Sequence, residues 1–325
     1  MNIAIIGAGM AGASAAHHLQ QLGHPVTVFD KSRGAGGRMS TRRGNGWTAD
    51  HGAQYFTASD PDFQVAVAQW CAHGAAAPWT GRIRAQRAEA LEVSESVTRY
   101  VGVPEMKSPV QHLLQGLQTH FSHTVNGLRR DTQGWHLSTA EHGEWATPFD
   151  GVALTLPLDQ TQAFEALLPQ AWTQQWRENV AMQPCWTLMA QWSDPLDWPF
   201  DGLFANDAMV DWLGCNSSKP GRSGMTSWTL QTTAAWSEEH LEDSAESVSE
   251  KLLAWIEARG APAPSSHTVH RWRYARSTGL ATAPALWDAA THLGVAGDWM
   301  CAGKVQGAWR SGRALAQRIV ATAQP

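Results

Sequence analysis

The chain has 325 residues and a formal net charge of −5, from 24 lysines and arginines against 29 aspartates and glutamates. This length suffices for two domains around a substantial core, and the acidic balance argues against a nucleic-acid-binding surface. The longest apolar runs stay below the roughly 18 residues that a membrane helix needs, and an apolar strand is expected almost directly after Met1. We therefore expect a cytoplasmic protein with neither a membrane span nor a signal peptide.

The first predicted elements form a nucleotide-binding unit. The apolar run Ile3–Ile6 favours a buried parallel strand, and a helix is expected over residues 11–22. Three glycines between and within them suit a tight turn, the close approach of a pyrophosphate, and the packing of helix on strand: Gly7, Gly9 and Gly12. The unpaired N–H groups at the helix start, near Met10 and Ala11, favour phosphate.

A second strand, predicted over residues 26–29, leads to Asp30 and Lys31. At this spacing after the glycines, the Asp30 carboxylate can bind the two hydroxyls of an adenosine ribose. Strand, glycines, helix, second strand and acid together predict a dinucleotide site, which a lone glycine motif would not establish. These elements by themselves fit an NAD-dependent dehydrogenase as well as a flavoprotein.

The next segment, residues 33–43, is rich in glycine and arginine. It resembles the Gly-Gly-Arg extension of FAD-containing oxidases built like monoamine oxidase, and the matching residues here are Gly37, Arg38 and Met39. The resemblance implies that Arg38 contacts the pyrophosphate of the cofactor. An NAD-only dehydrogenase explains neither this segment nor the C-terminal one, so the expected cofactor is FAD.

Near the other end, Gly297 and Asp298 precede a last helix that opens at Gln306, Gly307 and Ala308. This pattern resembles the terminal Gly-Asp motif of the same flavoproteins. It implies that Asp298 binds hydroxyls on the ribityl or phosphate side, and that the helix N-terminus faces the pyrimidine edge of the flavin. The Ser-Gly-Gly-Cys-Tyr sequence of the covalent amine oxidases is absent, so we expect non-covalent FAD.

Other reactive residues do not suggest a metal site. The cysteines occur singly, without a CxxC pair: Cys71, Cys185, Cys215 and Cys301. The fourteen histidines form no HExxH motif, and no Ser-His-Asp or Cys-His arrangement is recognisable. We expect free thiols and no metal.

The middle of the chain is expected to contain further strands and helices, and several of the strands are rich in tryptophan. Three strands resemble the β-meander of this flavoprotein fold and are expected over residues 124–130, 134–140 and 144–147. Amphipathic helices are expected over residues 62–73, 109–121, 157–168 and 237–259. Tryptophan-rich strands, expected over residues 185–192, 227–233 and 267–274, suit a sheet beside a flat aromatic substrate, although tryptophans also fill ordinary sheet cores.

These elements predict an α/β (α+β) chain of two interleaved domains. A Rossmann-type FAD-binding domain with a β-meander is expected to comprise residues 1–60, 101–158 and 290–325. A discontinuous substrate domain, built on an antiparallel sheet, is expected to comprise residues 61–100 and 159–289.

Blocks along the whole chain resemble the bacterial renalases. They are residues 30–40, 52–58, 100–106, 216–220, 270–276 and 297–299. The resemblance implies oxidation of the 2- and 6-dihydro isomers of NAD(P)H, with hydride passing to FAD and O2 reduced to H2O2. Because the hydride leaves from carbon, no general base is required, and the protein has to orient the reactants and exclude water. The expected partners are a pyridine nucleotide and O2; the oligomeric state is not predicted.

Six residues are candidates for the substrate site: Gln54, Tyr55, Asn216, Lys219, His270 and Trp272. The first two follow the cofactor segment, and Gln54 is also a candidate for contact with the flavin. The next two flank a Ser-Ser-Lys-Pro turn that can contact an amide or a phosphate. The last two alternate with Arg271 and Arg273 on one strand, so that one pair faces the pocket and the other faces away. Sequence alone does not decide which.

Two alternatives stay open. A small amine or polyamine oxidase uses the same cofactor, and the tryptophans could supply the aromatic cage that an ammonium needs. A non-catalytic binder, like the GDP-dissociation inhibitors that keep this fold without using flavin, is disfavoured because both cofactor segments are intact.

Overall fold

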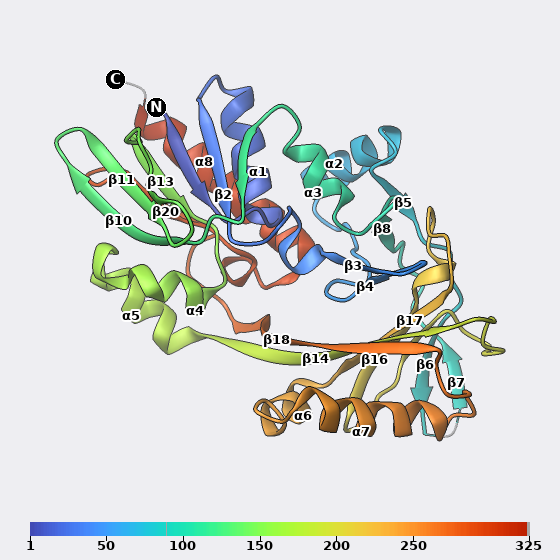
Figure 1. The fold of residues 1–325 in the computed structure, drawn as a ribbon. Coiled ribbons are helices and arrows are strands. Elements are labelled where there is room, and N and C mark those ends of the chain that lie inside the picture. Colours follow the sequence, from blue (N-terminus) through green and yellow to red (C-terminus); the bar gives the residue numbers. More distant parts are fainter. Residues whose placement is uncertain (89, 324–325) are drawn as a thin grey trace.

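The protein is described by a computed structural model that covers residues 1–88 and 90–323. Two large sheets dominate it, a six-stranded one beside the chain termini and a seven-stranded one in the opposite half (Figure 1). The predicted fold class, a Rossmann-like domain joined to a second domain built on a mainly antiparallel sheet, is confirmed. None of the helices in the described residues is both long and apolar enough to cross a membrane.

The six-stranded sheet is the predicted nucleotide-binding core. Its strands in spatial order are β19 (Leu286–Asp288), β20 (Leu293–Val295), β13 (Gly151–Leu154), β1 (Ile3–Ile6), β2 (Val26–Asp30) and β9 (Gln118–Phe121). Neighbouring strands are parallel except for β19 and β20. Side chains of β1 alternate between two cores, since Ile3 and Ile5 belong to one and Ala4 and Ile6 to the other.

Different elements cover the two faces of this sheet. Helices α1 (Met10–Gln21) and α8 (Lys304–Ala323) share a core with Ile3 and Ile5. The other core contains the meander, formed by β10 (Val125–Asp131), β11 (Gly134–Thr139) and β12 (Gly143–Glu144). The meander prediction is confirmed, with a last strand shorter than expected. The nucleotide-binding strand is thus buried on both faces, as its apolar sequence predicts.

The helix predicted over residues 109–121 is wrong in its second half. Helix α3 covers only Ser108–Leu113, and Gln118–Phe121 forms β9 at the edge of the sheet, paired with β2. Gly116 stands between them with a φ of +76°, a conformation that ends the helix. The backbone groups of β9 then pair with β2, a long-range contact that helical periodicity cannot reveal.

Two other predicted helices are interrupted. Residues 237–259 contain the end of α6 (Ala234–Glu239) and a separate helix α7 (Ala245–Glu257). Ser244 caps the second one, because its hydroxyl accepts a hydrogen bond from the N–H of Ser247. Residues 157–168 form a short α4 (Leu158–Thr161) followed by a 3-10 segment over Gln162–Leu167.

The seven-stranded sheet carries the tryptophan-rich strands. Its order is β18 (Ser266–Gly279), β14 (Val180–Trp192), β17 (Thr226–Thr232), β16 (Val210–Cys215), β15 (Gly202–Phe204), β6 (Ile83–Arg87) and β7 (Ala90–Val93). Neighbours are antiparallel except for β15 and β6. Helices α6 and α7 cover its outer face (Figure 1), where Trp186, Trp228 and Trp255 pack in one core. Several tryptophans therefore fill the sheet core.

Shorter elements connect the two sheets. They are β3 (Thr41–Gly44), β4 (Trp47–Asp50), α2 (Pro61–Ala72), β5 (Ala76–Pro78), β8 (Tyr100–Gly102) and α5 (Gln170–Asn179). Phe63 of α2 shares a core with Ile3, and Trp176 of α5 packs edge-on against Trp299, with 5.0 Å between ring centroids. These cores cross the expected domain boundaries, so the division into residue ranges stays a prediction.

Candidate cofactor and substrate site

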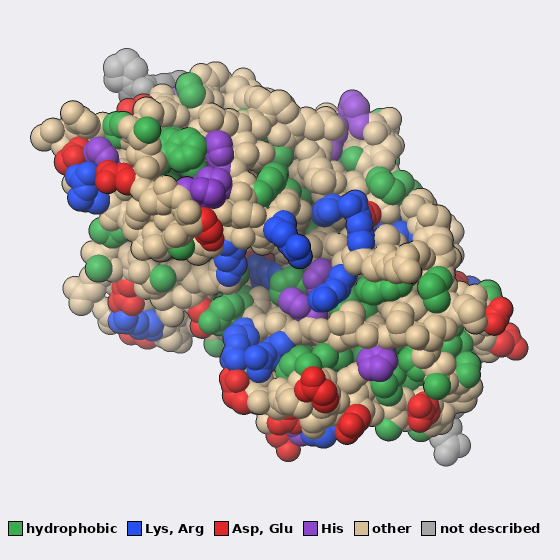
Figure 2. Space-filling view, in the orientation of Figure 1, with side chains coloured by type: hydrophobic (Ala, Val, Ile, Leu, Met, Phe, Trp, Pro, Cys, Tyr) green, Lys and Arg blue, Asp and Glu red, His purple; other side chains and the backbone are tan. Residues whose placement is uncertain are grey.

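A cavity of about 2890 Å³ lies between the two sheets and is lined by both. Figure 2 shows a hollow in the middle of one face, bordered by lysine, arginine and histidine side chains. Most predicted cofactor residues line the cavity: Gly7, Gly9, Met10, Ala11, Asp30, Lys31, Gly37, Arg38, Met39, Gln54, Asp298, Gln306 and Ala308. Gly12 and Gly307 lie outside its lining.

The glycines at the start of α1 form a cradle for phosphate. A Cβ atom at Gly12 would lie 1.9 Å from the carbonyl oxygen of Gly7, so only glycine permits this close packing. A Cβ atom at Gly9 would meet no heavy atom of the described residues within 4 Å, apart from its chain neighbours, because Gly9 faces the open cavity. Gly9 is the N-cap of α1, and no side chain in the part of the chain that the structure describes caps the helix there. The N–H groups of the first turn can therefore receive an anion.

Asp30 stands at the end of β2, at the edge of the same cavity. Its carboxylate accepts hydrogen bonds from the N–H of Ala8 at 2.6 Å and from the N–H of Ser32 at 2.7 Å. These bonds hold the carboxylate beside the glycine turn, and each oxygen retains acceptor capacity for a ribose hydroxyl. The cradle and the acid together fit a dinucleotide.

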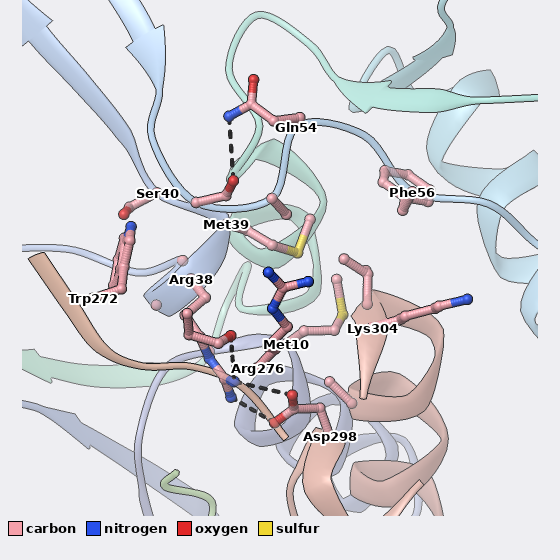
Figure 3. Close-up of a pocket in the computed structure, with 18 of the residues that line it drawn as sticks. Met10, Arg38, Met39, Ser40, Gln54, Phe56, Trp272, Arg276, Asp298 and Lys304 are labelled. Atoms are coloured by element: carbon pink, nitrogen blue, oxygen red, sulfur yellow. Dashed lines mark hydrogen bonds and ion pairs between the residues drawn. The ribbon is translucent and has the colours of Figure 1, made fainter. Parts of the chain in front are cut away.

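Arg38 and Asp298 lie next to each other although 260 positions separate them in the chain. The guanidinium donates to both carboxylate oxygens, at 2.5 and 3.0 Å, and also to the carbonyl of Ala275 at 3.2 Å (Figure 3). The two segments that resemble flavoprotein motifs thus meet in one ion pair. Their separate contacts with FAD stay predictions.

The N-terminal end of α8 borders the cavity, and Gln306 and Ala308 are among the residues that line it. The Oε1 atom of Gln306 accepts hydrogen bonds from the N–H groups of Ser59 and Asp60, at 2.8 and 3.1 Å. A Cβ atom at Gly307 would lie 2.4 Å from the carbonyl oxygen of Cys301, so Gly307 serves packing. The Gln306 side chain joins the helix to the segment before α2.

Strand β18 presents His270 and Trp272 toward the cavity. The His270 ring lies 4.9 Å from that of His51, and the Trp272 indole N–H donates to the carbonyl of His51 at 2.8 Å. Arg271 and Arg273 also border the cavity, but their guanidinium groups pair with Glu242, which connects α6 to α7 on the far face. The structure therefore shows that His270 and Trp272 face the cavity, a point that the sequence left open.

His51 belongs to the site, although sequence reasoning did not select it. It is 7% exposed, and its Nδ1 atom is buried without a hydrogen-bond partner among residues 1–88 and 90–323. Burial lowers the pKa of His51 to about 4, with smaller contributions from His270 and Arg42. Burial and the charge of Arg42 also lower the pKa of His270. Both imidazoles are therefore neutral at neutral pH. The only signal was the position of His51 directly before the Gly52 block.

Asn216 and Lys219 are buried at 1% and 2% exposure and lie outside the cavity lining. The Lys219 ammonium donates to Asp50 at 3.0 Å, and to the side-chain oxygens of Gln54 and Asn216, at 3.2 Å each. In this arrangement they support Gln54 from behind the cavity wall. The Ser-Ser-Lys-Pro turn thus buries its lysine although Ser217 is exposed, an orientation that sequence could not reveal.

Asp50 and Arg222 complete this network, and sequence reasoning missed both. Arg222 donates to the Asp50 carboxylate at 2.8 Å. Burial alone would raise the pKa of Asp50, but Lys219 and Arg222 lower it to about 2. Burial lowers the pKa of Lys219, and Asp50 opposes this shift. Asp50 is therefore ionised at neutral pH.

Tyr55 belongs to an aromatic group at one end of the cavity. Its ring lies 5.4 Å from Trp212 and 6.4 Å from Trp79. The Arg99 guanidinium, in a residue that is only 8% exposed, sits 5.3 Å from the Tyr55 ring and 6.0 Å from the Phe204 ring. This aromatic surface already holds a cation from the protein itself.

The remaining predicted chemistry concerns metals and thiols. The four cysteines are free. Residues 1–88 and 90–323 contain no group of three or more His, Cys, Asp or Glu side chains that could hold a metal ion.

Two family descriptions match the chain. Residues 5–70 match the NAD(P)-binding Rossmann-like domain, and residues 87–320 match the flavin containing amine oxidoreductases. The second match covers well over half of the chain. The chain belongs to the flavin containing amine oxidoreductases. The prediction of FAD is confirmed at the level of this family, and the glycine cradle and Asp30 fit that cofactor.

Curated relatives match only in a short segment. The 4,4'-diapophytoene desaturases (4,4'-diaponeurosporene-forming) of Staphylococcus aureus strains Newman and USA300 are 46% identical over 52 residues. These residues make up 16% of this chain and 10% of each desaturase. The match spans about a tenth of the relatives' length, so it carries no information on substrate.

Solved structures of several oxidases share the fold along nearly the whole chain. Cyclohexylamine oxidase from Brevibacterium oxydans IH-35A has a TM-score of 0.77 and 12% identity, covering 100% of this chain and 99% of its own. A putative protoporphyrinogen oxidase from Exiguobacterium sp. 255-15 has a TM-score of 0.75 and 11% identity, covering 98% of both chains. A putrescine oxidase triple mutant has a TM-score of 0.73 and 13% identity, also covering 98% of both chains. At these identities the similarity concerns the fold alone.

Proposed function

We propose that the protein is an FAD-dependent oxidase of the renalase type, which oxidises the 2- and 6-dihydro isomers of NAD(P)H to NAD(P)+. The observation that carries the proposal is the excess of positive charge around the cavity. Its basic side chains are Lys31, Arg33, Arg38, Arg42, Arg43, Arg87, Arg99, Lys107, Arg276 and Lys304, apart from Arg271 and Arg273, whose guanidinium groups pair with Glu242 on the far face. Its acidic side chains are Asp30, Glu95, Asp211 and Asp298. This balance favours a phosphate-bearing substrate over a cationic amine.

Two of these cations are available to a substrate. Arg42 and Lys304 have no carboxylate within ion-pair distance among the described residues. Arg99 has none either, but its guanidinium donates to the Ser94 hydroxyl and to the carbonyls of Glu95 and Val97. None of these cations belongs to the glycine and Asp30 unit that cradles the cofactor. A second anionic molecule beside FAD would offset their charge.

The aromatic residues also favour a phosphate-bearing substrate over a cationic amine. An ammonium substrate would require aromatic faces free of other cations. Here Arg99 lies over Tyr55 at 5.3 Å, and Lys219 lies 5.7 Å from the Trp79 ring. An amine in this place would meet resident positive charges.

The side chains of the site are better suited to orienting the substrate than to transferring a proton. When bound, FAD supplies the hydride acceptor and, on reoxidation, the electrons that reduce O2 to H2O2. Trp272 offers a flat face near His51 and His270, and both imidazoles are neutral at neutral pH. Hydride loss from a dihydropyridine leaves an aromatic pyridinium and requires no base. The protein then has to hold the nucleotide and exclude water. A cytoplasmic location belongs to this proposal.

The second candidate function is the oxidation of a small amine or polyamine. The name of the matching family, flavin containing amine oxidoreductases, favours it. The two candidates differ in the charge of the substrate, so one set of measurements separates them.

Flavin reduction under anaerobic conditions tests the proposal. The holoenzyme is mixed in a stopped-flow instrument with borohydride-reduced NAD+, with ordinary NADH, and with cyclohexylamine or putrescine. We expect fast bleaching by the dihydro isomers, slow bleaching by NADH, and none by the amines. The rate should be nearly flat between about pH 6 and 9, because no residue must change protonation. Fast bleaching by an amine, with a rate that rises toward the pKa of that amine, would refute the proposal.

A matched pair of variants tests the role of charge. Arg42→Gln removes an unpaired cation near His51 and His270, whereas Arg273→Gln removes one that pairs with Glu242 on the far face. We expect Arg42→Gln to raise KM for the dihydro isomers severalfold and Arg273→Gln to leave it unchanged. An equal effect of both variants would contradict the assignment.

A further inference from the structure

We infer that Asp50, Lys219 and Arg222 form a charged positioning element behind the cavity wall, which leaves one net positive charge there and raises the reduction potential of bound FAD. The element consists of residues that do not line the cavity, and it acts across Gln54, which does. The inference depends on FAD occupying the cavity and is independent of the substrate.

The charged side chains of all three residues are buried. The side chains of Asp50 and Lys219 are 0% exposed and that of Arg222 is 2% exposed. Two cations share one carboxylate oxygen, since Lys219 Nζ lies 3.0 Å and Arg222 Nη2 lies 2.8 Å from Oδ2 of Asp50. Among the described residues, no other carboxylate lies within 4 Å of either cation. One positive charge is therefore uncompensated, in a place where water does not screen it.

Hydrogen bonding indicates that Lys219 carries its charge. An ammonium has three N–H donors and no acceptor. Lys219 faces three acceptors, namely the carboxylate of Asp50 and the amide oxygens of Gln54 and Asn216. The Asn216 amide is oriented independently, because its NH2 group donates to Thr229 and its oxygen accepts from the N–H of Asp50. A neutral amine has only two donors and would leave one acceptor facing a lone pair.

The same contacts clamp Gln54. Its oxygen accepts from Lys219 at 3.2 Å, and its NH2 group donates to the carbonyls of Asp50 and Gly52, at 2.5 and 3.2 Å. Figure 3 shows this amide with its nitrogen turned to the backbone and its oxygen turned away. Because Lys219 can only donate, the oxygen must face it.

The element also lies close to the cofactor segments. The turn that Gln54 closes is joined to Arg38, since the N–H of Ala53 donates to the carbonyl of Arg38 at 2.8 Å. A Cβ atom at Gly52 would lie 2.0 Å from the same carbonyl oxygen, so the two segments are in direct contact. Arg38 in turn pairs with Asp298. The uncompensated charge therefore stands behind the wall that these cofactor-binding segments form.

A buried positive charge favours the more negative state of a neighbouring group. A unit charge that acts over about 10 Å, at an effective dielectric constant of about 20, changes an equilibrium constant by roughly tenfold. Reduction adds electrons to FAD, so the charge should favour the reduced form. A tenfold change corresponds to about 30 mV for a two-electron couple.

Three variants separate the charge from the clamp. Lys219→Met removes one charge and the clamp on Gln54. Arg222→Met removes one charge and keeps the clamp. The double variant Asp50→Asn/Lys219→Met lacks the clamp but retains the charge of Arg222, so its net charge equals that of the unmodified protein. Lys251→Met, which changes an exposed lysine paired with Asp243 on α7, is the control.

The midpoint potential of bound FAD is measured for each holoenzyme by equilibration with a reference dye, and thermal unfolding shows which variants fold. We expect Lys219→Met and Arg222→Met to lower the potential by about 30 mV or more, and the double variant and the control to match the unmodified protein. An unchanged potential in Arg222→Met would overturn the inference, as would a lowered potential in a folded double variant. No substrate is involved, so failure of the proposed oxidase activity would not affect the result.

Discussion

Replacement of Gly9 by alanine should weaken FAD binding strongly while leaving the apoprotein folded. Gly9 has φ −81° and ψ −176°, an extended conformation that alanine adopts readily. Among the described residues, its added methyl group would meet no heavy atom within 4 Å apart from its neighbours in the chain. It would point into the cavity, where the N–H groups of the first turn of α1 can receive a phosphate. Protein stability and cofactor affinity should therefore respond separately to this change.

The magnitudes follow from the two roles of the residue. An alanine in place of glycine at an N-cap costs about 1 kcal/mol or less. The methyl group would displace the pyrophosphate from the N–H groups of α1, and each lost hydrogen bond to a charged group costs about 1.5–3 kcal/mol. Loss of one such bond weakens binding by roughly 10- to 150-fold.

Titration of the apoprotein with FAD, followed by flavin fluorescence, measures the dissociation constant, and thermal unfolding of the apoprotein measures stability. Gly12→Ala is the contrasting variant, because its Cβ would lie 1.9 Å from the Gly7 carbonyl oxygen and should lower the unfolding temperature of the apoprotein itself. An unchanged FAD affinity in a folded Gly9→Ala protein would refute the placement of the phosphate.

Other outcomes concern charge and pH. Asp30→Ala should weaken FAD binding by about 1.5–3 kcal/mol through lost ribose hydrogen bonds, and an unchanged dissociation constant would remove Asp30 from the site. The pKa of His51 is about 4 in the folded protein, against 6.5 ordinarily, so the free energy of unfolding should fall by up to about 3 kcal/mol as pH decreases from 6.5 to 4. Denaturant unfolding of His51→Asn should show a smaller decrease over the same pH range than the unmodified protein. Lys219 and Arg222 hold the pKa of Asp50 near 2, so the contribution of Asp50 to the free energy of unfolding, about 2 kcal/mol, should disappear as pH falls from 3.8 toward 2. If Asp50→Asn lost as much stability in acid as the unmodified protein, this expectation would be contradicted.

Sequence determined the nucleotide-binding unit because its parts are local. The strand, the glycines, the first helix turn and Asp30 lie within thirty residues, and their spacing alone brings them together. Gly9 and Gly12 could be assigned to different roles from the motif, since the reasons for glycine are backbone sterics. The tryptophan-rich strands were likewise predicted from local pattern, and the meander from its resemblance to this flavoprotein fold. Their arrangement into sheets was not.

Tertiary structure decided everything that depends on contacts distant in sequence. Arg38 meets Asp298 across 260 positions, and Asp50 meets Lys219 across 169. Residues 118–121 form a strand because they pair with β2. Arg271 and Arg273 form ion pairs with Glu242, between the helices on the outer face of the sheet. A buried charge or an edge strand is stabilised by partners that the chain supplies only after folding. Local sequence therefore could propose Lys219 for the site, but only the folded chain placed it behind the cavity wall.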